Sequence, residues 1–253
     1  QSLGLSAPLT RKIFSEVINY SVSRQVAALA GIEGELNESL VAYQGTPLTY
    51  NNLAAEQFMA SQGLRARFVG MPTLKRMIDA LLAGSVSLAM LPIENTAAGS
   101  NNQVYDVLRE QDLHIVGEES FRIEPCLAAI GDVPVPALRK ILSHPLALDQ
   151  SSAFIETLPQ VQVVPVLDTR EAMRMVAEAK DPTLAAIGSP EAAAAHELAI
   201  INRNVGNQDE ILMRYVALAR APMPVDLRVP SKTSLILSTR LEKGALLRCL
   251  QIL

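Results

Sequence analysis

The sequence predicts an α/β protein built from two lobes. Short apolar runs of the buried-strand type alternate with helical patterns from Leu40 to about residue 221, as in mostly parallel sheets covered by helices. This alternation forms two blocks, with a crossover near 117–121 and a return near 198–213. Apolar residues make up 49% of the chain, which is enough for a substantial core. We expect lobe 1 over about 40–118 plus 199–221, and lobe 2 over about 119–198.

A separate segment, residues 1–31, precedes the two lobes. Its apolar spacing predicts one long helix over 9–30. On this helix Ser21 and Gln25 share a face with the apolar residues Phe14 and Ile18. The two polar residues indicate either an ordinary helix surface or a polar pocket in a helical bundle, and the spacing alone favours the ordinary surface.

Within the lobes, the elements follow from apolar runs and from the residues that interrupt them. Gly84 ends one helical pattern, and Ser189 is a good N-cap for another. For the first block we expect strands at 40–44, 67–70, 87–91 and 114–118 and helices at about 51–62, 73–83 and 101–110. The second block begins with an apolar run at 121–130, and we expect strands at 141–143, 161–166 and 184–188. Helices should start near 144, 168 and 189. Two further strands are expected at 198–202 and 213–219, where the chain returns to the first lobe.

The end of the chain predicts the beginning of a further module. A proline-containing linker at 222–231 leads to a predicted strand over 232–240 and to the first turns of a helix from Gly244. One strand and one short helix cannot bury their own apolar faces. We therefore expect residues 231–253 to need a partner or further chain.

Four polar loops stand at predicted strand ends or helix starts, at residues 45–50, 92–100, 143–150 and 168–172. They offer hydroxyls, amides and free helix N–H groups, which bind anions. Each loop alone is most simply a cap or a turn. Four of them at the mouth of one cleft between lobes favour a binding site for a small carboxylated ligand.

These loops carry a family resemblance. VAYQGTPLTYNNLAAEQF resembles the opening motif of the prephenate dehydratases, with Gly45, Thr49 and Tyr50 at matching positions. PIENTAAGS (92–100) resembles their PIENS-x-x-G-S loop, and SHPLALDQ (143–150) resembles their SHPQAL-x-Q motif. The order and spacing hold from about 40 to 246. The resemblance implies a two-lobed fold like that of type II periplasmic binding proteins.

The two ends of the chain resemble the neighbours of this catalytic part in bifunctional bacterial enzymes. LTRKIFSEVINYSVSRQ resembles the third helix of an all-helical chorismate mutase, with Ser21 and Gln25 at substrate-contacting positions. This segment alone does not make a mutase. KTSLIL…GAL resembles the start of a phenylalanine-sensing ACT domain, a ferredoxin-like regulatory module. This likeness implies a phenylalanine effector at residues 231–253.

The implied reaction is the decarboxylating dehydration of prephenate to phenylpyruvate, or of its amino analogue arogenate to phenylalanine, without cofactor or metal. Arg214 is the expected anchor of a substrate carboxylate. Glu94 is either an acid or a partner of Arg214, and His144 is either a ligand group or a cap. The expected catalytic residues are Thr49, Glu94, Asn95, Thr96 and Arg214, and the expected substrate-binding residues are Tyr50, Ser143, His144, Gln150, Thr169 and Tyr215.

One departure from the family bears on the chemistry. The family motif N-x-T-R-F, whose threonine is its key hydroxyl, corresponds here to Ile211-Leu212-Met213-Arg214-Tyr215. A thioether cannot donate a proton. We therefore expect weak turnover with the donor moved to Thr49, Thr96 or another hydroxyl. The alternative is a non-catalytic regulatory or ligand-binding relative; a solute-binding protein is disfavoured by the missing secretory signal and by the KTSLIL segment.

Composition limits the remaining possibilities. The formal charge of −4 argues against nucleic-acid binding, and no window approaches the ~18 apolar residues of a membrane span. Cys126 and Cys249 are far apart, and the three histidines are scattered, so we expect no metal site. Two free thiols fit the reducing cytoplasm. The apolar faces of the terminal segments predict a homodimer or larger assembly.

Overall fold

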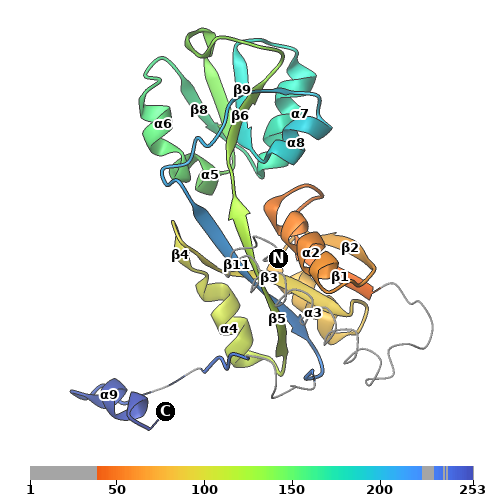
Figure 1. The fold of residues 1–253 in the computed structure, drawn as a ribbon, viewed down its shortest axis with the longest axis vertical. Helices are drawn as coiled ribbons and strands as arrows, with labels where there is room; N and C mark the ends of the chain where they lie inside the picture. Colours follow the sequence, from red (N-terminus) through yellow and green to blue (C-terminus); the bar gives the residue numbers. More distant parts are fainter. Residues whose placement is uncertain (1–38, 224–230, 236, 238, 253) are drawn as a thin grey trace, which may run out of the picture. The chain divides into compact units, whose positions relative to one another are not determined.

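A computed structural model describes residues 39–223, 231–235, 237 and 239–252 (Figure 1). The chain divides into two compact units, residues 1–223 and 224–253. In the part of the first unit that the structure describes, two mixed β-sheets form two lobes. The predicted helix over 9–30 lies outside the described residues.

The first lobe contains a six-stranded sheet in the order β2-β1-β3-β11-β5, with β4 paired to β3. The strands β1, β2 and β3 are parallel, whereas β11 runs antiparallel to both of its neighbours, β3 and β5. β11 is therefore a central strand although it comes last in sequence. The bounds are β1 Ser39–Gln44, β2 Ala66–Met71, β3 Leu88–Asn95, β4 Gly99–Ser100, β5 His114–Ile123 and β11 Ile211–Ala219.

Helices cover both faces of this sheet: α2 (Tyr50–Ser61) on one face, and α3 (Leu74–Leu82) and α4 (Asn102–Glu110) on the other. The alternation of side chains along β1 explains why both faces are apolar. Val41 and Tyr43 pack with α2, and Ala42 between them packs with α3 and α4.

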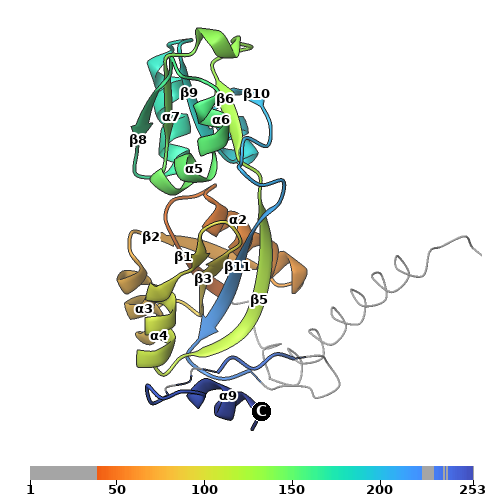
Figure 2. The same cartoon turned by 90° about the vertical axis from the view of Figure 1, so that its left-hand side faces the viewer.

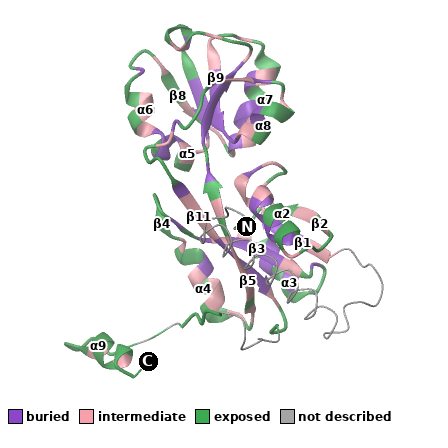
Figure 3. Cartoon of the chain, viewed as in Figure 1, coloured by how far each residue is buried: buried purple, intermediate pink, exposed green. Residues whose placement is uncertain are grey.

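The second lobe contains a five-stranded sheet in the order β10-β6-β9-β7-β8. Its middle strands are short, and their residues apart from Lys140 and Leu184 are buried because helices cover them (Figures 2 and 3). The strands are β6 Cys126–Ala129, β7 Lys140–Ser143, β8 Gln162–Pro165, β9 Leu184–Gly188 and β10 Ala199–Asn202. The helices are η1 Val135–Ala137, α5 Pro145–Gln150, α6 Ser152–Glu156, α7 Thr169–Ala179 and α8 Pro190–Ala195.

The boundary between the lobes differs from the predicted one in two places. The expected break at 118/119 falls inside β5, which continues to Ile123. β5 carries polar residues there, but β11 pairs with it along its whole length and so keeps it extended. β10, expected in lobe 1, pairs with β6 in the second sheet. Residues 124–125 and 203–210 thus join the two lobes.

The second unit contains one helix, α9 (Ala245–Leu250). The predicted strand over 232–240 is wrong in so far as its range is described: residues 232–235, 237, 239 and 240 adopt no strand. A strand needs a neighbouring strand for its backbone hydrogen bonds, and this segment has none among the described residues. The leucines of α9 are exposed: Leu246 57%, Leu247 61% and Leu250 54%.

Candidate functional site

A cavity of about 410 Å³ lies between the two lobes of the first unit. Loops and strand ends from both sheets line it, as the positions of the four polar loops predict. Seven of the predicted site residues are in its lining: Thr49, Tyr50, Asn95, His144, Gln150, Thr169 and Tyr215. Glu94, Thr96, Ser143 and Arg214 are not among the lining residues.

The loop after β1 forms one wall of this cavity in a strained conformation. Gly45 has a φ of +108° and Leu48 has a φ of +67°, a region that L-residues rarely adopt. A Cβ at Gly70 would lie 2.4 Å from the Gly45 carbonyl oxygen, so the loop needs a glycine beneath it. The Leu48 N–H donates to Asn52 Oδ1 at 2.8 Å, and the Thr49 hydroxyl donates to the Thr46 carbonyl at 2.8 Å.

The same loop contacts the second lobe directly. The Thr46 hydroxyl donates to Asp168 Oδ2 at 3.1 Å, and the Ser189 hydroxyl donates to the Leu48 carbonyl at 3.3 Å. These two hydrogen bonds hold the lobes together beside the cavity.

A β-bulge in β3 determines which side chains enter the cavity. Along β11, Met213 lies opposite Asn95 and Arg214 lies opposite Glu94, but Tyr215 lies opposite Pro92 because Ile93 is the extra residue. Such a bulge re-aims the side chains on one side of it. As a result Asn95, Met213 and Tyr215 line the cavity.

Three buried donors of this cavity have no hydrogen-bond partner among the described residues: the Tyr50 hydroxyl, Asn95 Nδ2 and Gln150 Nε2. Asn95 is 5% exposed, and its Oδ1 already accepts from the N–H groups of Ala97 and Ala98 at 2.8 and 3.1 Å. Its NH₂ group is therefore the part left for a ligand. Burial raises the pKa of Tyr50 well above 10, so its hydroxyl stays protonated. Unpaired buried donors are costly, and three in one cavity indicate a ligand rich in acceptor oxygens.

The other predicted hydroxyls are already used by the fold. Thr49 donates within its own loop, Tyr215 donates to Asn51 Oδ1 at 3.0 Å, and Ser143 is fully buried and donates to the Ile187 carbonyl at 2.6 Å. Thr96 accepts from the Leu212 N–H at 3.0 Å and lies outside the lining. Within the described lining, the Tyr50 hydroxyl is the hydroxyl that is buried without a hydrogen-bond partner.

Arg214 does not reach the cavity, contrary to its predicted role as a carboxylate anchor. Its guanidinium binds Glu94 at 3.3 Å and Glu118 at 3.0 Å. The hydrogen bond that Arg214 donates to Glu118 contributes most to raising the pKa of Arg214. Of the two interpretations of Glu94, the structure favours the ion pair with Arg214. Strand alternation is the reason, because Met213 and Tyr215, its neighbours in β11, occupy the cavity side.

His144 is the N-cap of α5. Its Nδ1 accepts from the Leu146 N–H at 3.2 Å, which leaves Nε2 to carry the hydrogen of the neutral ring. Burial lowers the pKa of His144 below 6.5, so the ring is neutral at pH 7. It is a neutral donor at the cavity wall rather than a cation.

The charge of the cavity comes from a residue that the sequence did not single out, Asp168. Within the described lining Asp168 is the carboxylate, and no lysine or arginine is present. Its Oδ1 accepts from the Glu171 N–H at 2.7 Å and so caps α7. The sequence indicates the polar loop at 168–172 but not the role of its first residue.

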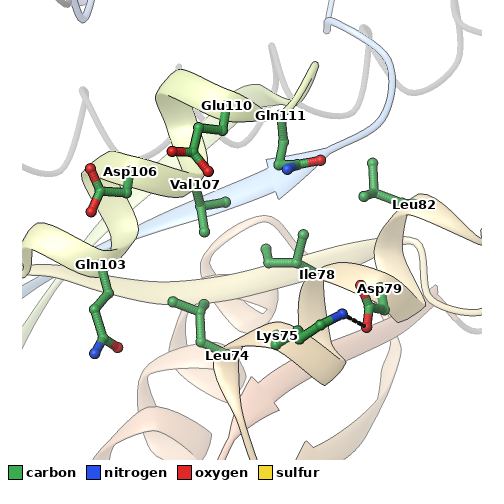
Figure 4. A pocket seen from close by; sticks show the side chains of 10 residues that line it. All are labelled: Leu74, Lys75, Ile78, Asp79, Leu82, Gln103, Asp106, Val107, Glu110 and Gln111. Atoms are coloured by element: carbon green, nitrogen blue, oxygen red, sulfur yellow. Dashed lines mark hydrogen bonds and ion pairs between the residues drawn. The ribbon is translucent and has the colours of Figure 1, made fainter.

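A second cavity, of about 440 Å³, lies between α3 and α4 (Figure 4). Leu74, Ile78 and Val107 give it an apolar floor, and acidic residues stand at its rim. Lys75 is bound to Asp79 at 2.7 Å. None of the predicted site residues and none of the unpaired donors lies there.

Two absences hold for the described part of the chain. No group of three histidine, cysteine, aspartate or glutamate side chains is placed to hold a metal ion. No helix in that part is long and apolar enough to span a membrane.

Comparison with known proteins identifies the family. Residues 41–223 match the model of the prephenate dehydratase family. The chain belongs to this family. It is 32% identical over 251 residues to the bifunctional chorismate mutase/prephenate dehydratase of Escherichia coli K12, covering 98% of this chain and 65% of the relative. It is also 32% identical over 212 residues to arogenate dehydratase/prephenate dehydratase 2, chloroplastic, of Arabidopsis thaliana, covering 84% of this chain and 54% of the relative.

Solved structures confirm the two-lobed α/β fold of this prephenate dehydratase family member. The Arthrobacter aurescens prephenate dehydratase in complex with L-Phe matches with a TM-score of 0.68 at 24% identity, covering 84% of this chain and 71% of that one. GqqA, described as a novel type of quorum quenching acylase, matches with a TM-score of 0.62 at 33% identity, covering 76% and 67%. The chain spans about 65% of the length of the bifunctional relative from Escherichia coli K12.

Proposed function

We propose that this chain carries the catalytic part of a dehydratase of phenylalanine biosynthesis, which converts prephenate to phenylpyruvate or arogenate to phenylalanine. The observation that carries the proposal is the set of unpaired donors Tyr50, Asn95 and Gln150 in the cavity between the lobes. Both substrates carry two carboxylates and one ring hydroxyl, which together supply the acceptors that these donors lack.

The chemistry requires two bonds of the substrate ring to break. The bond to the ring carboxylate breaks and releases CO₂, and its electron pair makes the ring aromatic. The bond from the ring carbon to the hydroxyl breaks at the same time, and one proton from solvent turns the departing hydroxide into water. Donors held in place beside the departing oxygen stabilise the charge that develops on it.

The cavity supplies a polar part and an apolar part for this reaction. The NH₂ groups of Asn95 and Gln150 bind and orient carboxylate oxygens. Met213, Ile123 and Leu146 form apolar lining. We place the ring carboxylate against the apolar lining, because a carboxylate that loses its charge as CO₂ gains from apolar surroundings.

Tyr50 is the proposed donor to the departing hydroxyl. Met213 occupies the position where the family resemblance places a threonine, so the hydroxyl must come from elsewhere. Thr49 is engaged with Thr46, and Thr96 is outside the lining. The centroid of the Tyr50 ring lies 6.2 Å from that of Phe121, and Phe121 is the residue of β5 that pairs with Met213. The Tyr50 side chain is therefore near the position where the family resemblance places the threonine.

The terminal segments belong to the same proposal. The chorismate-mutase-like helix expected over residues 1–31 lies outside the described residues, and we propose that residues 231–253 begin an ACT-type module that binds phenylalanine as effector. The exposed leucines of α9 support a larger module or assembly that covers them, and we propose a homodimer or larger assembly in the cytoplasm.

An absorbance assay for phenylpyruvate with the purified chain and prephenate tests the proposal, together with an assay for phenylalanine from arogenate. We expect turnover below the range of about 1–10³ per second that is ordinary for enzymes, because Met213 replaces a hydroxyl. A chain that turns over neither substrate under any condition contradicts the proposed activity.

A second candidate is a relative that binds the same ligands without turnover, and Met213 favours it. Calorimetric titration with prephenate and arogenate separates the two functions. Binding with no product formation over many hours supports the non-catalytic relative.

Acylase activity, which the description of GqqA names, has less support from this cavity. Burial raises the pKa of Cys126 to about 11, which keeps this thiol from acting as a nucleophile. His144 Nδ1 is occupied by a backbone N–H. Across the described lining, no serine, threonine or cysteine is hydrogen-bonded to His144. The dehydration is therefore the function that the geometry supports best.

A further inference from the structure

The charge of the cavity distinguishes the two substrates. Prephenate is a keto acid with two negative charges, and arogenate carries the same two carboxylates plus an ammonium group. In the described lining the one charged group is the carboxylate of Asp168. His144 beside it is neutral, and the guanidinium of Arg214 is held by Glu94 and Glu118 outside the cavity. No cation of the lining is available to offset a dianion.

The carboxylate of Asp168 is held in place and still has room for a ligand. Its Oδ1 accepts from the Glu171 N–H and its Oδ2 accepts from the Thr46 hydroxyl. A carboxylate has about four lone-pair positions, so two remain free. Asp168 is half-buried at the cavity wall, where its charge is less screened than on an open surface.

The unpaired donors of the cavity are suited to the carboxylates of the same ligand. Asn95 and Gln150 are 5% and 8% exposed, and their free NH₂ groups bind carboxylates without adding charge. A ligand with carboxylates at one end and an ammonium near Asp168 satisfies both kinds of group. A second negative ligand charge near Asp168 is repelled instead, which is how a site rejects a competitor.

We propose that Asp168 binds the substrate ammonium group and thereby makes this chain select arogenate over prephenate. This inference rests on the proposed dehydratase function. The product is then phenylalanine, formed with one CO₂ and one water and with the uptake of one proton from solvent. The ammonium group takes no part in bond breaking, so Asp168 is a specificity-determining residue.

The test compares kcat/KM for arogenate and for prephenate in the natural chain and in Asp168→Asn. Asparagine keeps an oxygen that accepts from the Glu171 N–H, so α7 keeps its cap while the charge is removed. We expect the natural chain to prefer arogenate. We expect the variant to lose about tenfold or more of kcat/KM for arogenate, the effect of one charge-assisted hydrogen bond, and to keep or gain activity toward prephenate.

Asp181→Asn is the matched control. Asp181 is also half-buried in the second lobe, and its Oδ1 accepts from the N–H and the hydroxyl of Thr183 at 2.8 Å each. It is not in the cavity lining, so the ratio of the two kcat/KM values should not change. Thermal unfolding of both variants checks that the fold is kept.

Two results overturn the proposal: a preference of the natural chain for prephenate, or an equal loss for both substrates in Asp168→Asn. If neither substrate is turned over, the dehydratase function fails, and calorimetric titration with the two ligands still decides the role of Asp168. Tighter binding of arogenate that is lost in Asp168→Asn supports the proposal, and equal binding of both ligands contradicts it.

Discussion

The two lobes contribute different kinds of polar group to the cavity. In the first lobe, Tyr50 and Asn95 present donors that nothing in the described structure satisfies. In the second lobe, Ser143, His144 and Asp168 form hydrogen bonds with backbone groups of that lobe. Gln150 is the exception, because its NH₂ group has no partner among the described residues. The difference predicts that changes at Tyr50 or Asn95 mainly affect catalysis, whereas changes at Ser143, whose hydroxyl is used within the fold, mainly affect stability.

The largest expected effect is on the rate of Tyr50→Phe. This change removes only the unpaired hydroxyl, so we expect kcat to fall by about 10²-fold or more, the usual contribution of one positioned hydrogen-bond donor to the charge that develops in the transition state. The free energy of unfolding should stay the same or rise, because a buried unsatisfied hydroxyl is lost. Tyr105→Phe on α4, outside the cavity, is the control. Equal rates in both variants contradict the proposed donor.

The second-largest expected effect is a gain of activity in Met213→Thr. Met213 lies opposite Asn95 in the cavity, so Met213→Thr introduces a hydroxyl beside the free NH₂ group. We expect kcat to rise by about tenfold or more, and more so in the Tyr50→Phe background, with little change in affinity. Ile211 should be left unchanged, because it is 1% exposed and an asparagine there would be buried. A double-mutant cycle of steady-state rates measures the coupling, and strictly additive effects would show that the two hydroxyls have unrelated roles.

Ser143→Ala tests the second lobe. The buried Ser143 hydroxyl donates to the Ile187 carbonyl at 2.6 Å, so its loss should lower the free energy of unfolding by about 1–3 kcal/mol with little direct effect on kcat. Ser61→Ala is matched to it: Ser61 donates to the Phe58 carbonyl at 2.8 Å but is exposed, and its loss should cost within about 0.5 kcal/mol. Chemical denaturation gives both values. A large loss of kcat without loss of stability would assign Ser143 to the reaction.

The smallest effect is the pH dependence of stability that His144 produces. Burial lowers the pKa of His144 in the folded state below the 6.5 of the free side chain, so the unfolded state binds a proton more readily. The contribution of His144 to the free energy of unfolding is fully present above about pH 6.5. It is lost as the pH falls toward the pKa of the folded state. Chemical denaturation between pH 7.5 and 5 gives the free energy of unfolding at each pH. Its slope against pH should be shallower in His144→Gln, and an unchanged slope would show that folding does not change the protonation of this ring.

The sequence predicts most of the elements because their apolar periods are clear. The strands at β1, β7 and β9 and the helices α2, α3 and α7 lie within a few residues of their expected places. The length of β5, which was expected to end at residue 118, and the sheet to which β10 belongs were predicted wrongly, because the partner strand and not the local pattern decides them. β11 keeps the polar end of β5 extended, and β10 pairs with β6.

The candidate site shows the same limit at the level of single residues. Strand-end loops indicate the cavity because the topology brings such ends together. Whether Arg214 or Met213 enters the cavity depends on the phase of β11 and on the bulge at Ile93, which no motif encodes. The lack of a partner for the Tyr50 hydroxyl and the position of Asp168 at the cavity wall likewise depend on how distant segments pack together.

The place of β11 in the first sheet has a consequence for how the chain is made. A ribosome delivers β1 to β5 first, then the whole second lobe, and only afterwards the strand that joins β3 to β5. Until then β3 and β5 expose unpaired edges, which are prone to wrong pairing. The second lobe, with a contiguous sheet from Cys126 to Asn202, can fold during synthesis while the first must wait. Misfolding of a nascent chain is thus concentrated in the interval between residues 123 and 219, and a chaperone that binds exposed strand edges would act there.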